Sequence, residues 1–249
     1  RDADGKGGGQ DAPDLVVLAA ASLRDVIPAL AEPWAARHPG SALIATYDGS
    51  GALRARIEAG APADLFAAAD RADPQVLADA CLTRGGPRGF AGNTLALAVR
   101  AGDPAGIAEI ADLARPGLRI VGAAPSVPVA RYTAQLLDAV AATQPDPAAW
   151  SAAVAANTVS LEDNVRTALA RVGLGEADAA IVYATDIAAD PALAAVPIPD
   201  ALNVVTEYAA VVPAGAAQPA LAGELLAFLA GPEGQAVLAD AGFLPPPRP

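Results

Sequence analysis

The sequence contains few of the residues on which catalytic and metal sites depend. Its 249 residues include one cysteine, one histidine and no methionine. The single Cys81 excludes an internal disulfide, and the single His38 provides neither a cluster of metal ligands nor an evident general base. The chain also lacks the P-loop motif, the H-E-x-x-H zinc motif and the G-x-S-x-G nucleophile elbow. We therefore do not expect an enzyme.

Basic residues and long apolar runs are also scarce. With 28 acidic and 16 basic residues the net charge is −12, which repels a phosphate backbone, so nucleic acid is not an expected partner. No apolar run approaches the roughly 18 residues that cross a bilayer. Hydrophobic residues make up 53% of the chain, which is enough to bury the core of one large domain or two modest ones. A globular protein is expected.

The N-terminal segment has no apolar pattern. Residues 1–13 are polar and include three consecutive glycines, which predicts a flexible tether. The missing methionine indicates that the chain has been trimmed, and a signal sequence would be among the residues removed. Such a leader fits both an exported protein anchored by a lipid on an upstream cysteine and a remnant of cloning.

Short apolar runs alternate with helical patterns along the rest of the chain. The expected strands are residues 15–18, 43–47, 64–68, 95–99, 118–121, 179–183 and 208–212. The expected helices are residues 50–59, a helix that carries Tyr132 and Val140, and residues 164–172, 219–229 and 232–241. Repeated strand-helix units of this length predict an α/β protein with parallel or mixed sheets and helices on both faces.

The helix expected after the first strand contains conflicting signals. Ser22 and Asp25 have the S-x-x-D spacing of a capping box, and the apolar residues that follow recur at helical spacing. Pro28 and Pro33 each remove a backbone donor, so we expect a kink or a break in this helix.

Two predictions concern the segment after the third strand. Asp73 followed by Pro74 predicts a helix whose cap is Asp73 and whose first turn contains the proline. Cys81 follows apolar residues on neighbouring helical turns, which favours a buried, inert thiol over a reactive one.

Three strand-to-helix junctions combine hydroxyl groups with small residues. They are residues 19–22, 49–51 and 125–129. Free N–H groups and the positive end of the helix dipole converge at a helix start, and small residues allow a close approach, so these junctions can bind an anion. Each of these residues also has a purely structural interpretation. Serines in the positions of Ser22 and Ser50 are more often helix caps than ligand-binding residues. Gly49 and Gly51 can simply serve a turn, and Tyr183 can be an aromatic residue at the edge of the core.

Six stretches occur in the order and with the spacing of one family. They are Ala19-Ala-Ala-Ser-Leu23, Gly49-Ser-Gly-Ala-Leu53, Glu58-Ala-Gly-Ala-Pro-Ala-Asp-Leu-Phe66, Pro125-Ser-Val-Pro128, Glu162-Asp-Asn-Val-Arg166, and Ile181-Val-Tyr183 followed by Asp186. The Gly-Ala-Pro-Ala-Asp-Leu-Phe string is highly specific, and the set spans nearly everything after the tether. The sequence therefore resembles the molybdate-binding proteins of bacterial and archaeal molybdate ABC transporters.

The resemblance implies a two-lobed, α/β type II periplasmic-binding-protein fold with mixed sheets, flanking helices and a ligand cleft between the lobes. It divides the chain into a tether of residues 1–13, a first lobe of residues 14–93 plus 207–249, and a second lobe of residues 94–206. It implies a periplasmic or otherwise extracytoplasmic receptor that delivers molybdate or tungstate to the membrane permease of an ABC importer. One form of this prediction has the receptor anchored to the membrane by a lipid. It implies a monomer without a cofactor or a directly coordinated metal.

Five site residues carry over from the family. They are Ser22 and Ser50 of the first lobe, through hydroxyl and backbone N–H, and from the second lobe the backbone N–H groups of Val129 and Val165 and the phenol of Tyr183. A cage of neutral donors cannot pair with the proton of hydrogen phosphate, so fully ionised dianions are preferred.

The chain departs from the family pattern near one proposed amide donor. Ala130 stands where the family has glycine and restricts the backbone, and Arg131 adds a cation close by. Three alternatives remain beside the molybdate or tungstate receptor. They are a receptor for another tetrahedral oxyanion such as sulfate, a ligand-sensing domain of the same fold, and an esterase with Ser22 or Ser50 as nucleophile.

Overall fold

The structure is a computed structural model that describes residues 12–188 and 190–247. Residues 1–11 of the predicted tether lie outside the described residues. The strands are β1 (Leu15–Ala20), β2 (Leu43–Asp48), β3 (Leu65–Ala68), β4 (Arg88–Arg100), β5 (Ile120–Ala123), β6 (Thr158–Glu162), β7 (Ala179–Tyr183), β8 (Leu193–Val196) and β9 (Val205–Val211).

Helices follow most of the strands, as the alternating pattern predicts. The α-helices are α1 (Val26–Arg37), α2 (Ser50–Glu58), α3 (Ala72–Asp79), α4 (Pro128–Ala141), α5 (Pro147–Asn157), α6 (Val165–Gly173), α7 (Ala184–Ala188), α8 (Pro219–Ala230) and α9 (Pro232–Asp240). Two short 3-10 helices are η1 (Ala21–Leu23) and η2 (Ile110–Ala114). Among the described residues, none of these helices is both long enough and apolar enough to span a bilayer.

The strands form a mixed sheet in the order β2-β1-β3-β9-β4-β7-β5-β6, with β8 paired to β4. The long strand β4 connects its two parts. Residues 88–94 of β4 pair with β9, and residues 95–100 pair with β7 and β8. We call β1, β2, β3, β9, the start of β4, the 3-10 helix η1 and helices α1, α2, α3, α8 and α9 the first lobe, and the remaining elements the second lobe. The mixed α/β fold class predicted from the sequence is confirmed.

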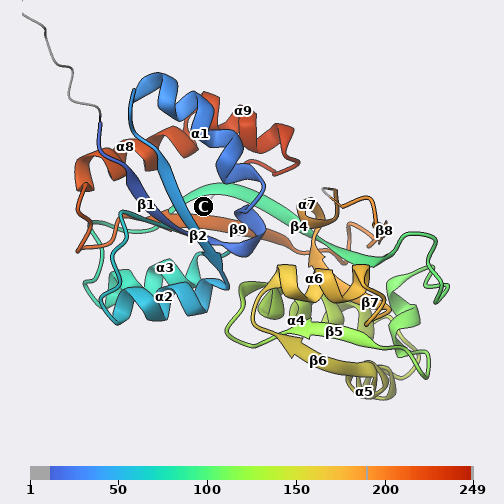
Figure 1. Ribbon diagram of the computed structural model, residues 1–249. Coiled ribbons are helices and arrows are strands. Elements are labelled where there is room, and N and C mark those ends of the chain that lie inside the picture. Colours follow the sequence, from blue (N-terminus) through green and yellow to red (C-terminus); the bar gives the residue numbers. More distant parts are fainter. Residues whose placement is uncertain (1–11, 189, 248–249) are drawn as a thin grey trace, which may run out of the picture.

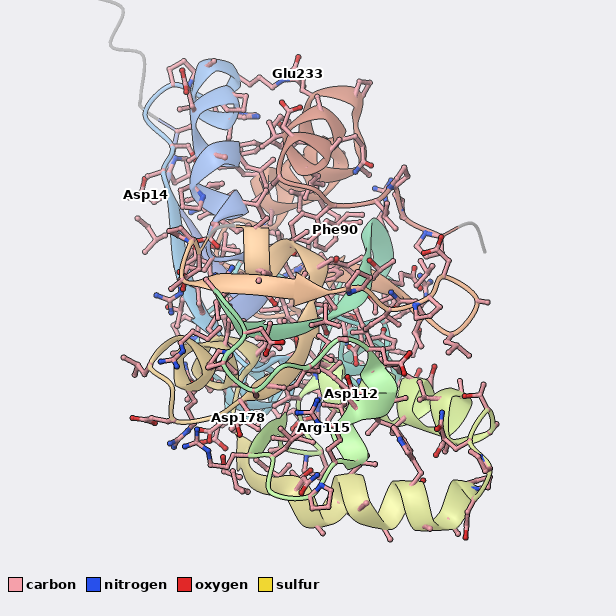
Figure 2. All side chains as sticks on the ribbon, turned by 90° about the vertical axis from the view of Figure 1, so that its right-hand side faces the viewer. Asp14, Phe90, Asp112, Arg115, Asp178 and Glu233 are labelled. Atoms are coloured by element: carbon pink, nitrogen blue, oxygen red, sulfur yellow. The ribbon has the colours of Figure 1, made fainter. Side chains whose placement is uncertain are left out.

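The part of the sheet that belongs to the first lobe is buried between helices. In the first lobe, α1, α8 and α9 cover one side of the sheet and α2 and α3 cover the other (Figure 1). The strand β3 is therefore buried along its whole length, which explains its uninterrupted apolar sequence. Figure 2 shows the two lobes at opposite ends of the molecule, with Glu233 at one end, Asp112 and Arg115 at the other, and Phe90 of β4 between them.

The chain entering α1 breaks where the sequence predicts a conflict. The 3-10 helix η1 ends at Leu23, and α1 begins at Val26, so the break falls before Pro28. Pro28 then occupies the first turn, where its missing N–H costs nothing, and α1 continues through Pro33. The predicted capping box is absent here, because Asp25 is the N-cap without a side-chain bond to the helix.

Two local predictions around α3 were wrong. The N-cap of α3 is Arg71, and Asp73 lies inside the first turn, where its N–H donates to Asp70 Oδ1 at 3.0 Å. Cys81 is exposed rather than buried. Its φ of 59° shows that the chain leaves the helix in a left-handed conformation, which turns the residue away from the core that a continued helix would reach.

Candidate functional site

A small cavity lies between the two lobes. Its lining comes from four junctions: Ala20, Ala21 and Ser22 after β1; Asp48, Gly49 and Ser50 after β2; Val127 and Pro128 before α4; and Asn164 and Val165 before α6, together with Ala69 and Tyr183. The cavity volume is about 10 Å³. That is about the space that one water molecule needs, so the lobes are nearly closed over this site.

The first lobe contributes two buried serine hydroxyls. Ser50 is the first residue of α2, and its Oγ accepts a hydrogen bond from the backbone N–H of Ala69 at 3.1 Å. Ser22 lies in η1, and its Oγ accepts from the phenol of Tyr208 at 2.9 Å. Neither serine is the N-cap of an α-helix, so the interpretation of both as plain caps was wrong. Each keeps its own hydroxyl hydrogen for another acceptor.

The second lobe contributes the starts of two helices. Val165 is the first residue of α6, after the N-cap Asn164, whose side chain accepts from Thr167 N–H at 3.0 Å. Val129 is the second residue of α4, after Pro128. The N–H groups of first-turn residues have no acceptor within their own helix and carry the positive end of its dipole. Val165 lines the cavity. Val129 is buried and follows the lining residue Pro128 in the chain, but it is not among the residues that line the cavity.

Tyr183 ends β7 and reaches across to the first lobe. Its phenol donates to the carbonyl oxygen of Ala69 at 3.4 Å, a long bond that another acceptor can replace. Burial raises the pKa of Tyr183 well above 10, so the phenol stays protonated and acts as a donor. Ala69 thus contacts both sides of the cleft, through its N–H to Ser50 and its carbonyl to Tyr183.

The charged groups near the cavity are paired away from it. Asp48 lines the cavity, but its oxygens bind the N–H of Gly49 at 2.9 Å and the guanidinium of Arg56 at 2.6 Å. Arg131, the cation expected near an amide donor, pairs instead with Asp70 in the first lobe. Ala130 fits into the first turn of α4, where its N–H bonds the carbonyl oxygen of Val127 at 2.9 Å.

The two lobes touch closely at a pair of glycines. A Cβ atom on Gly49 would lie 2.5 Å from the carbonyl oxygen of Asp163, and one on Gly51 would lie closer than 3.0 Å to that of Ser126. Both oxygens belong to the second lobe. Gly49 has an ordinary φ of −60°, so space rather than turn geometry requires glycine here. The interpretation of these glycines as turn residues therefore missed their main role.

Two ion pairs join the lobes on either side of the cavity. Arg131 of α4 pairs with Asp70, whose side chain is 3% exposed, and lies 4.0 Å from Asp73. Arg166 of α6 pairs with Asp25 at the start of α1. In both pairs the second lobe supplies the cation and the first lobe the carboxylate. We call them the Arg131 clasp and the Arg166 clasp.

Arg166 also contacts a buried carboxylate of its own lobe. Its Nε lies 3.0 Å from Asp186 Oδ1, and Asp186 is fully buried at the start of α7. Burial is the largest cause of the shift that raises the pKa of Asp186 to about 7, and the charge of Arg166 opposes it.

The fold and the cavity together define a two-lobed binding protein of the type II periplasmic class. The family model for bacterial extracellular solute-binding proteins matches residues 15–244. The chain therefore belongs to the bacterial extracellular solute-binding protein family.

Several relatives within this family carry more specific names. The molybdate-binding protein ModA of Mycobacterium tuberculosis is 36% identical over 238 residues, which cover 95% of this chain and 87% of the relative. ModA of Haemophilus influenzae is 28% identical over 178 residues, which cover 69% of this chain and 66% of the relative. Among solved structures, the periplasmic molybdate-binding protein of Azotobacter vinelandii has a TM-score of 0.78 at 23% identity and covers 94% of this chain and 100% of its own. The sulfate-binding protein SubI of M. tuberculosis has a TM-score of 0.82 at 22% identity, and the match covers 94% of this chain and 87% of SubI.

The sequence missed two kinds of residue at the site. Tyr208 was predicted only as part of a strand, although its hydroxyl holds Ser22, which is 186 residues away in the chain. Asp25 was predicted only as part of a capping box and Asp70 had no predicted role, because which acid meets Arg166 or Arg131 depends on how the lobes face each other. To identify these two acids as partners, one would first have needed the order of the strands, which determines how the lobes are arranged.

Proposed function

We propose that this protein binds molybdate or tungstate between its lobes and delivers it to the membrane permease of an ABC importer. Membership of the solute-binding family makes it an extracytoplasmic binder rather than an enzyme, and the oxyanion is its ligand rather than a cofactor. The observation that carries the proposal is the convergence of Ser22, Ser50, Val165 and Tyr183 on one small cavity.

The proposed site consists of neutral donors from both lobes. Ser22 and Ser50 donate through their hydroxyls, Tyr183 through its phenol, and Val129 and Val165 through their backbone N–H groups. Among the described residues that line the cavity there is no lysine, arginine or histidine. Helix starts and hydroxyls can hold a dianion without a cationic side chain, because the donors are fixed before the ligand arrives.

A panel of oxyanions tests this function. A ligand that binds only the folded state at a thousandfold excess over its dissociation constant stabilises the protein by about 4 kcal/mol. We expect molybdate and tungstate to raise the melting temperature clearly and phosphate to have little effect. Isothermal titration then gives the affinities. No response to either heavy oxyanion would refute the proposal.

Sulfate is the second candidate ligand. The same neutral donors suit any fully ionised tetrahedral dianion, so only the size of the cavity separates sulfate from the larger molybdate. The same panel decides the matter, since a sulfate receptor would respond to sulfate at concentrations where molybdate has no effect.

The finer organisation is also part of the proposal. We place the lobe boundaries at residues 93/94 and 206/207, which lie side by side in β4 and β9, where the chain crosses between the lobes. We further propose a monomer that a lipid attaches to the membrane. Analytical ultracentrifugation tests the monomer, and mass spectrometry of the protein from its native membrane tests the lipid.

A further inference from the structure

Tyr208 is a fully buried residue of β9 that does not line the cavity. Its phenol donates to Ser22 Oγ at 2.9 Å, and its ring packs edge-on against Tyr183, with ring centroids 5.5 Å apart. Phe90 and Phe243 contact the same ring at 6.2 and 5.4 Å between centroids. The phenol is therefore held in one place behind Ser22.

A chain of hydrogen bonds fixes which way the Tyr208 hydroxyl points. The backbone N–H of Thr94 can only donate, and it donates to Asn93 Oδ1 at 2.9 Å. The Asn93 amide must then direct its NH₂ group to the other side, where it donates to Thr185 Oγ1 at 2.9 Å and lies beside the Tyr208 oxygen. With the Asn93 NH₂ group on this side, the Tyr208 phenol donates its own hydrogen to Ser22 Oγ.

The same logic applies to Ser50. The backbone N–H of Ala69 can only donate, so Ser50 Oγ is the acceptor of their 3.1 Å bond. Both serines therefore have an oxygen lone pair occupied from the protein side. The one hydrogen that each hydroxyl has left is free for the cavity.

We propose that Tyr208 is a specificity-determining residue: by donating to Ser22 Oγ from behind, it directs the Ser22 hydroxyl hydrogen into the cavity and thereby disfavours protonated oxyanions. This inference rests on the proposed function of the cavity. A ligand that carries an O–H group, such as hydrogen phosphate, needs an acceptor, and the remaining lone pair of Ser22 can serve it only if the serine hydrogen turns away from the cavity. Asn93 orients Tyr208, and Tyr208 orients Ser22. Tyr208 itself does not touch the ligand.

The test is the ratio of molybdate affinity to phosphate affinity in Tyr208→Phe. The substitution keeps the ring and its packing but releases a lone pair of Ser22. We expect molybdate affinity to fall less than tenfold, and the preference for molybdate over phosphate to fall by about ten- to a hundredfold, the size of one unsatisfied buried group. Tyr132→Phe is the matched control, because it removes a phenol in α4 that does not bond either serine.

A double-mutant cycle separates this role from a merely structural one. If Tyr208 acts through Ser22, adding Tyr208→Phe to Ser22→Ala leaves the affinity ratio unchanged. A ratio in Tyr208→Phe equal to that of Tyr132→Phe, while the unmodified protein binds molybdate, overturns the inference and leaves the proposed function standing. If the unmodified protein binds no oxyanion, the proposed function fails first.

A second measurement does not depend on any variant folding. A neutron structure of the molybdate complex locates the hydroxyl hydrogens directly. We expect the Tyr208 hydrogen on the line to Ser22 Oγ and the Ser22 hydrogen on the line to a ligand oxygen. A Tyr208 hydrogen directed to Asn93 would overturn the inference.

Discussion

At the scale of single residues, the proposed site depends on hydroxyl donors that are free or, like Tyr183, held only by a long hydrogen bond. We predict that Ser22→Ala and Tyr183→Phe each weaken molybdate binding by about 1.5 to 3 kcal/mol, the range for a hydrogen bond to a charged group. Isothermal titration measures the change, and Ser151→Ala on the exposed face of α5 is the control. Unchanged affinity in both variants would mean that the ligand binds elsewhere.

Asp186 gives a residue-scale prediction about pH. Its pKa is raised by burial from 3.8 to about 7, with Arg166 beside it and Asp25 beyond Arg166. Between those two values the folded protein holds a proton that the unfolded chain has released. The free energy of unfolding therefore falls as the pH rises through this window and levels off above about pH 7.

The Asp186→Asn variant isolates this effect. We expect its unfolding free energy, measured by urea denaturation across the window, to fall less with rising pH than that of the unmodified protein. Parallel pH profiles for the two proteins would contradict the assignment of a raised pKa to Asp186.

Residue types and junctions were enough to predict part of the cavity lining. Ser22 and Ser50 stand out because small residues and hydroxyls follow apolar strands, and family resemblance adds Val165 and Tyr183. The dependence on Tyr208 could not be predicted, because a tyrosine in a strand gives no sign of the serine that it will meet. The exposure of Cys81 was missed for a local reason, since its left-handed conformation overrides the helical pattern before it.

At the scale of secondary-structure elements, the start of α2 determines how closely the lobes approach. We predict that Gly51→Ala weakens oxyanion binding at least about tenfold, because the new methyl group would collide with the backbone of Ser126 and hold the lobes apart. The fold itself should not lose stability, since alanine is the better helix former. Isothermal titration and thermal unfolding without ligand measure the two effects.

A matched control exists in α8. Gly223 is also a helical glycine, but a Cβ atom there would have no neighbour within 4 Å. Gly223→Ala should leave oxyanion affinity unchanged while it stabilises the helix slightly. Equal affinities for the two alanine variants would show that contact at Gly51 does not limit closure.

The elements were predicted well where one pattern governed them. Strand β7 and helix α6 agree with their apolar runs to within a residue. The helix α2 ends close to the predicted residue 59, and Gly60 follows it with a φ of 84°. Strand β4 was predicted too short. Its first half carries Gly89, Gly92 and Asn93, which are poor strand residues, and only pairing with β9 makes that segment extended.

At the scale of the whole molecule, the two clasps oppose the opening of the cleft. We predict that Arg131→Gln weakens molybdate binding by about 1 to 3 kcal/mol and accelerates its release, because the buried carboxylate of Asp70 loses its charged partner in the closed form. Stopped-flow dissociation measures the rate. Arg119→Gln is the control, since the Arg119–Asp178 pair lies within the second lobe. Equal release rates in the two variants would mean that the Arg131 clasp does not hold the lobes.

The order of strands across the molecule has a consequence for how the chain matures. Strand β9 lies between β3 and β4, so the sheet of the first lobe stays divided until almost the entire polypeptide has emerged. The second lobe is built from a continuous stretch and can assemble while the C-terminal segment is still being transported. Because β9 also carries Tyr208, the contact between Tyr208 and Ser22 forms only once this late strand is in place.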